Sequence, residues 1–124
     1  MNKLTILLLA LVAVNTPSAL AGTPETVRLD FFHTGNAEME VFSVDQVVIE
    51  PLPWPGNTGW PLDETRRGKY LFAVVHPENE AVLYSRSFSR IYGEWETTAE
   101  AREMDRTMHV SLRFPRPDGA VEVV

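Results

Sequence analysis

Apolar side chains recur at every second residue in several segments of this chain of 124 residues. The clearest case runs from Met108 to Phe114, where apolar and polar residues alternate strictly. Val27, Leu29 and Phe31 follow the same pattern. A period of two is typical of a β-strand with one buried face and one face in water. These segments therefore predict strands.

A long strand is predicted over residues 41–50, and its apolar residues change parity halfway, across Asp45-Gln46. Before that point the even positions are apolar, as at Phe42, and after it the odd positions are, as at Val47. A regular pleat cannot place both sets on one face of a sheet, so the change predicts a bulge or bend inside the strand.

The other predicted elements are short. Apolar runs over residues 70–75 and 81–84, separated by turn residues, predict an antiparallel hairpin. Capping-box spacing at Thr97 and Glu100 predicts one helix of about two turns. With a last strand over 121–124, six strands and at most one short helix favour an all-β fold, an antiparallel β-sandwich.

The segment 51–61 contains four prolines and two glycines. Proline lacks the N–H that a strand ladder needs, so this segment predicts an extended, polyproline-like loop with no ladder.

The first 21 residues have the pattern of a signal peptide. Lys3 precedes an apolar run over 4–14, and Ala19 and Ala21 give an A-x-A site with cleavage before Gly22. The run is too short to span about 30 Å of hydrocarbon. We expect a mature domain over 22–124, secreted or periplasmic, with no membrane contact after cleavage.

Charge and cysteine content exclude several classes of function. The chain has 11 basic and 17 acidic residues, and removing Lys3 with the leader leaves a formal charge of −7. Such a charge repels phosphate backbones, so we expect no nucleic-acid partner. The absence of cysteine excludes disulfides, thiolate metal sites and a cysteine nucleophile.

The sequence shows no local catalytic motif. His33, His76 and His109 are far apart and lack the spacing of a zincin helix, so each is interpreted as a turn or surface residue. Glu94 and Glu96 would lie about 7 Å apart on one side of an extended segment, a spacing that any E-x-E strand shares. No catalytic residue, metal ligand or cofactor is expected.

Four aromatic residues fall in or beside the predicted loops: Trp54, Trp60, Tyr92 and Trp95. Exposed aromatics on a sandwich can stack on sugar rings or contact a partner domain. Alternatively, they close the ends of a small core, which a chain of about 100 residues without disulfides needs.

Several blocks with matching order and spacing resemble one family over nearly all of the mature chain. The blocks are residues 32–36 (FHTGN), 50–56 (EPLPWPG), 67–70 (RGKY), 83–86 (LYSR), 91–98 (IYGEWETT) and 111–115 (SLRFP). They look like the N-terminal domain of the secreted M64 metallopeptidases, the IgA peptidase family. The resemblance implies a β-sandwich that precedes a zinc peptidase domain carrying HExxH. This sequence contains no HExxH, so no catalytic residue is carried over from the family.

Two functions remain open. The first is a non-catalytic exported accessory domain that packs against an M64 peptidase domain or orients its substrate. The alternative is a free-standing module that binds carbohydrate or extracellular protein through the loop aromatics. A third possibility, a glycosidase using Glu94 and Glu96, rests on their spacing alone.

Overall fold

The computed structural model describes residues 6–8 and 22–124, which form seven strands and two short helical turns. The signal peptide expected over residues 1–21 lies outside the described residues apart from Ile6–Leu8. The elements in chain order are β1 (Ile6–Leu8), β2 (Glu25–Gly35), β3 (Glu40–Pro53), β4 (Tyr70–Val75), β5 (Val82–Phe88), α1 (Ile91–Trp95), the 3₁₀ turn η1 (Glu100–Arg102), β6 (Arg106–Pro115) and β7 (Val121–Val123).

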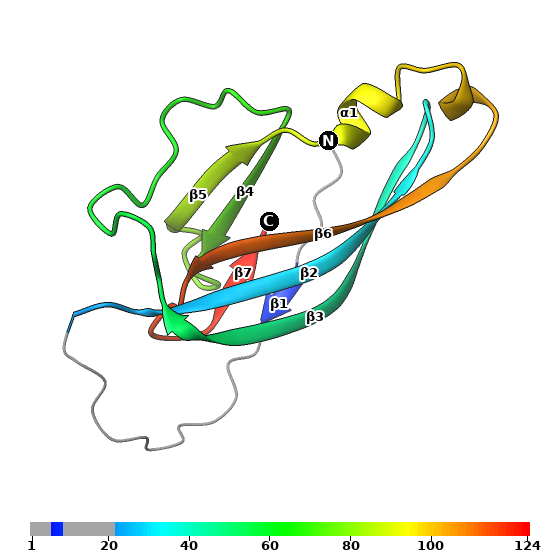
Figure 1. The fold of residues 1–124 in the computed structure, drawn as a ribbon. Helices are drawn as coiled ribbons and strands as arrows, with labels where there is room; N and C mark the ends of the chain where they lie inside the picture. Colours follow the sequence, from blue (N-terminus) through cyan, green and yellow to red (C-terminus); the bar gives the residue numbers. More distant parts are fainter. Residues whose placement is uncertain (1–5, 9–21) are drawn as a thin grey trace.

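The strands form two antiparallel sheets, which confirms the predicted all-β sandwich (Figure 1). One sheet has the order β3-β2-β6, with β2 in the centre. The other has the order β1-β7-β4-β5, and its outer members are β1 and β5. All six strands predicted from alternation and apolar runs are present, and the predicted hairpin is β4–β5.

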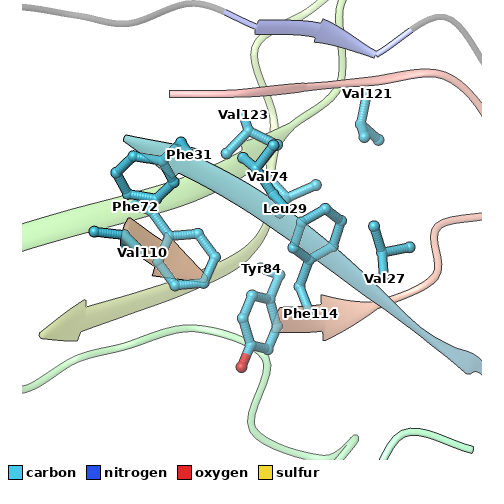
Figure 2. Close-up of a cluster of buried hydrophobic side chains, with 10 residues drawn as sticks. All are labelled: Val27, Leu29, Phe31, Phe72, Val74, Tyr84, Val110, Phe114, Val121 and Val123. Atoms are coloured by element: carbon cyan, nitrogen blue, oxygen red, sulfur yellow. The ribbon is translucent and has the colours of Figure 1, made fainter. Parts of the chain in front are cut away.

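The main core lies between the two sheets (Figure 2). Val27, Leu29 and Phe31 of β2 point into it, and Val27 and Leu29 are each 1% exposed. Phe114 of β6 is fully buried and packs near Phe72 of β4, with ring centroids 6.5 Å apart. The remaining members, which Figure 2 draws, are Phe31, Val74, Tyr84, Val110, Val121 and Val123. Strand alternation therefore places the sequence's apolar positions on the inner faces.

The predicted bulge in the long strand is present. Gln46 pairs with Asp30 and Val44 pairs with Phe31, so Asp45 has no partner of its own in β2. The extra residue resets the parity of β3, so Val44 and Val47, on either side of the bulge, pair with Phe31 and Leu29 of β2 and share their face. Both valines lie on an edge strand and remain 42% and 38% exposed. With this irregularity β3 can pair with all 11 residues of β2.

Two predictions about the loops were wrong. The ladder of β3 reaches Pro53, which pairs with Glu25, although a loop was expected from Pro51 onward. A strand at the edge of a sheet needs N–H groups on one side only, so proline is tolerated there. The expected helix after Thr97 is only the 3₁₀ turn η1, and the α-helical turn is α1, which precedes it. Within the described residues, no helix is long and apolar enough to cross a membrane.

Candidate functional site

Three of the sequence blocks that carry the family resemblance meet at one end of the sandwich. They come from the end of β2, the start of β4 and α1. Their polar and aromatic side chains form a group that we call the His33 cluster: His33, Glu40, Lys69, Tyr70, Tyr92 and Glu96. These interacting side chains join both sheets to α1.

His33 lies at the centre of this cluster and is 1% exposed. Its ring is stacked between Tyr92 and Phe42, with centroid distances of 3.8 Å and 4.4 Å. Nε2 lies 2.8 Å from Oε2 of Glu40, close enough for an ion pair but out of line for a hydrogen bond. Burial lowers the pKa of His33, and the Glu40 carboxylate opposes this only in part. Burial therefore favours the neutral form of the ring.

Glu40 is the acceptor that the cluster shares. Tyr70 donates its hydroxyl to the same Oε2 at 2.7 Å, and Nζ of Lys69 lies 3.9 Å from Oε1. Lys69 also makes a close ion pair with Glu96 at the end of α1. Burial, followed by the bond to Glu40, raises the pKa of Tyr70, so this hydroxyl remains a donor. Glu40 thus joins β2, β3 and β4, and Lys69 extends the link to Glu96 at the end of α1.

Tyr92 fastens α1 to the turn between β2 and β3. Its hydroxyl donates toward the carbonyl oxygens of Asn36 and Met39, at 3.0 Å and 3.2 Å. Gly35 makes this approach possible, because a Cβ there would come closer than 3.0 Å to both Met39 O and the Tyr92 hydroxyl. Tyr92, Trp95 and Ala101 form a second buried cluster. Trp95 donates from Nε1 to Glu100 at 2.6 Å.

The structure separates the four aromatic residues singled out from the sequence. Tyr92 and Trp95 are buried, with exposures of 0% and 9%. Trp54 is half-buried and meets Tyr84 edge to face at 5.7 Å. Trp60 is 76% exposed, and of these four it is the one available to a ligand or partner.

The loop that carries Trp60 is fixed to β5. The Arg86 guanidinium donates to the carbonyl oxygens of Trp60 and Pro61, at 2.7 Å and 3.0 Å. Ser85 N–H donates to Pro61 O at 2.9 Å, and the hydroxyl and N–H of Ser87 both donate to Asp63. These bonds lower the pKa of Asp63. The loop covers the outer edge of β5 and holds Trp60 in place.

The histidines do not come together. His76 lies in the turn after β4, and His109 lies on the outer face of β6, 3.4 Å from Asp45. Across residues 6–8 and 22–124, no three His, Cys, Asp or Glu side chains are grouped closely enough to hold a metal ion. Glu94 and Glu96 lie at the end of α1, and residues two apart on a helix do not face each other. The extended geometry assumed for this pair was wrong.

The interpretation of His33 as a turn or surface residue was wrong, because His33 lies within β2 and is 1% exposed. Sequence reasoning also missed Glu40, Lys69 and Tyr70 as its partners. Lys69 and Tyr70 belong to one of the blocks that carry the resemblance, so their position in that block was the available signal. Glu40 lies outside those blocks, and no local pattern marks it.

The chemistry open to the His33 cluster is limited by its enclosure. An imidazole beside a carboxylate can act as a general base only if a substrate reaches it. A cavity of about 630 Å³ does exist, but it is lined by residues of the β4–β5 turn and the segment 115–121, at the other end of β6. The side chains at the His33 cluster contact one another and so hold the end of the sandwich together.

Two comparisons with known proteins complete the description of the site. The sequence model of a family described as Peptidase M64 N-terminus matches residues 21–124. No curated protein matches the chain.

Proposed function

Because this chain belongs to the family described as Peptidase M64 N-terminus, we propose that it is a non-catalytic, exported accessory domain. It packs against a zinc peptidase domain or orients substrate for that domain. The observation that carries the proposal is the enclosure of His33, whose ring is stacked between two aromatic rings at 1% exposure. The blocks that resemble the family therefore contribute side chains that pack against one another in this chain.

The surface proposed to meet the peptidase domain is the loop that presents Trp60. In this loop Trp60 and Leu62 are 76% and 46% exposed, and we call these two residues the loop patch. Arg86 anchors the loop by two hydrogen bonds to its backbone, so little conformational entropy is lost when a partner binds. A preorganised, exposed tryptophan is the residue type that most often dominates binding energy at interfaces.

The first experiment measures affinity between the full chain and a purified M64 catalytic domain by isothermal titration calorimetry. Trp60→Ala should weaken binding by about tenfold or more, which corresponds to about 1.4 kcal/mol. Ile91→Ala is the matched control, because Ile91 is also exposed, at 69%, but lies on α1 away from the loop. Equal effects of the two variants would contradict a contact through the loop patch.

The non-catalytic part of the proposal is tested on the purified chain alone. We expect no peptide hydrolysis with or without added zinc, because the His33 ring is 1% exposed and closed to substrate. Stoichiometric zinc in a metal assay, together with cleavage of a general protease substrate, would refute it. Sequencing the N-terminus of the exported product tests the leader, and a mature protein that begins at Gly22 is expected.

The second candidate function is a free-standing module that binds carbohydrate or extracellular protein, and the exposure of Trp60 favours it. Tryptophan fluorescence of the full chain, titrated with glycans and with extracellular proteins, separates the two functions. A saturable shift that Trp60→Ala abolishes, in the absence of any M64 domain, supports the binding module. Binding to the M64 domain alone supports the accessory role.

A further inference from the structure

The two outer edges of the β1-β7-β4-β5 sheet are closed in different ways. At β5 the chain covers the edge with its own loop, since Ser85 N–H bonds to Pro61 O and Ser87 N–H bonds to Asp63. At the other edge β7 pairs with β1, whose three residues Ile6–Leu8 belong to the expected leader. The structure therefore seats a short extended segment on an edge that the rest of the described chain leaves unpaired.

The register shows which backbone groups this segment uses. Val124 and Ala73 exchange two hydrogen bonds of 2.9 Å, and Glu122 pairs with Val75. Hydrogen-bonding direction alternates along an antiparallel strand, so Glu122 and Val124 bond to β4, whereas Val121 and Val123 turn their N–H and C=O groups toward β1. These two residues pair with Leu8 and Ile6. Without β1 their backbone groups have no strand partner, and such an edge invites another strand.

The same register sets the chemistry of the segment that fits. Val121 and Val123 are 2% and 3% exposed, so their side chains lie on the core side. Residues paired across two strands share a face, so in any strand added to β7 the residues opposite Val121 and Val123 meet the core side, and apolar side chains are expected there. The residue between them pairs with Glu122, on the opposite face. An apolar–X–apolar segment fits, with X free to be polar or basic.

We propose that the free edge of β7 is a strand-acceptor site for an extended apolar segment of a partner polypeptide, which adds antiparallel to β7. In the full chain Ile6–Leu8 occupies this edge, and removal of the leader frees it. Only the statement that the edge becomes free rests on the proposed export. Main-chain bonds give such strand addition its affinity, and the alternating side chains give its specificity.

The first test uses amide hydrogen exchange on the full chain. Leu8→Pro removes an N–H that faces β7 and puts the proline ring in the place of that ladder bond, so β1 can no longer lie against the edge. Without the carbonyls of β1 as acceptors, exchange at Val121 and Val123 should become about tenfold faster or more, while Glu122 and Val124 stay protected by β4. Leu7→Pro is the matched control, because the N–H of Leu7 faces away from β7 and a proline there leaves the ladder donors intact. Equal acceleration at all four amides, or at none, would overturn a separable acceptor edge.

The second test supplies the segment in trans to the Leu8→Pro chain. A peptide with the sequence of residues 4–10 and a charged tail should restore protection at Val121 and Val123. Replacing its middle residue, Leu7→Lys, should leave this effect intact, whereas Ile6→Lys or Leu8→Lys should abolish it. Loss with all three substitutions, or no protection from the parent peptide, refutes the partner site.

A concentration-dependent dimer of the Leu8→Pro chain that protects the same amides would instead assign the edge to a second copy. These readouts do not depend on export, so a leader that is never cleaved would leave the acceptor edge intact and refute only the export.

Discussion

Replacing Gly35 with alanine tests the packing of α1 against the turn after β2. The added methyl group would come closer than 3.0 Å to Met39 O and to the Tyr92 hydroxyl, and Met39 O is a backbone atom. Relief requires both α1 and the turn at Met39 to move, which also breaks the bonds from Tyr92 to Asn36 O and Met39 O. Overpacking costs about 1–3 kcal/mol, and buried groups left without partners cost a further 1–3 kcal/mol or so.

We therefore expect Gly35→Ala to lower the free energy of unfolding by about 2–6 kcal/mol, a large part of the roughly 5–15 kcal/mol typical of a domain. The assay is urea unfolding followed by tryptophan fluorescence, with the slope of the transition checked for two-state behaviour. Gly119→Ala is the matched control, since nothing lies within 4 Å of a Cβ built there. It should change stability by less than about 1 kcal/mol.

A double mutant separates the two collisions. Tyr92→Phe removes the hydroxyl that the new methyl group would meet, but Met39 O remains in its way. The combined loss for Gly35→Ala with Tyr92→Phe should be smaller than the sum of the two single losses. Strict additivity, or a Gly35→Ala protein within about 0.5 kcal/mol of the parent, would refute this account of the packing.

Three further predictions concern the cluster, the core and the loop. The pKa of His33 in the folded chain is below its ordinary 6.5, so the unfolded chain takes up the extra proton first as the pH falls. The free energy of unfolding should be highest above pH 6.5 and fall as the pH drops through the lowered pKa of His33 in the folded chain. His33→Phe should flatten this pH dependence in urea titrations from neutral to mildly acidic pH. Phe114→Ala should lower the free energy of unfolding by about 3–5 kcal/mol. Phe32 is 38% exposed on the outer face, so Phe32→Ala should lower it much less. Similar losses for the two variants would contradict the assigned core. Asp63→Asn should lower the melting temperature, because it weakens the acceptor of Ser87 and Thr65. Asp118→Asn in the exposed loop serves as the control. An unchanged melting temperature for both variants would refute the role of Asp63.

The strands and the bulge could be predicted from the sequence because each depends on neighbouring residues. Alternation fixes which face of a strand is buried, and the parity change at Asp45-Gln46 fixes where a regular pleat must fail. The helical turn α1 could not be predicted in this way. It has five residues with Gly93 in the middle, and it is held by the burial of Tyr92 and Trp95. Tertiary packing therefore outweighs its weak intrinsic propensity.

The His33 cluster depends on contacts between distant parts of the chain. Tyr92 meets the carbonyl of Asn36 across 56 residues, and Tyr70 meets Glu40 across 30. No local pattern indicates that such residues meet, although three of the blocks carrying the resemblance do converge there. The prediction for the proline-rich segment was wrong for a related reason. Whether a strand tolerates proline depends on whether that strand lies at the edge or in the interior of the sheet.

The unpaired residue at Asp45 also determines where the third β-strand of the chain can change in length. Deleting Asp45 would remove the bulge yet keep every apolar residue of that strand on its present side, because the second half already has the opposite parity. Deleting one residue within either regular half would turn the positions beyond it to the wrong side. Single-residue gaps in homologous chains should therefore concentrate at this point, which acts as a natural insertion and deletion boundary within an otherwise fixed ladder.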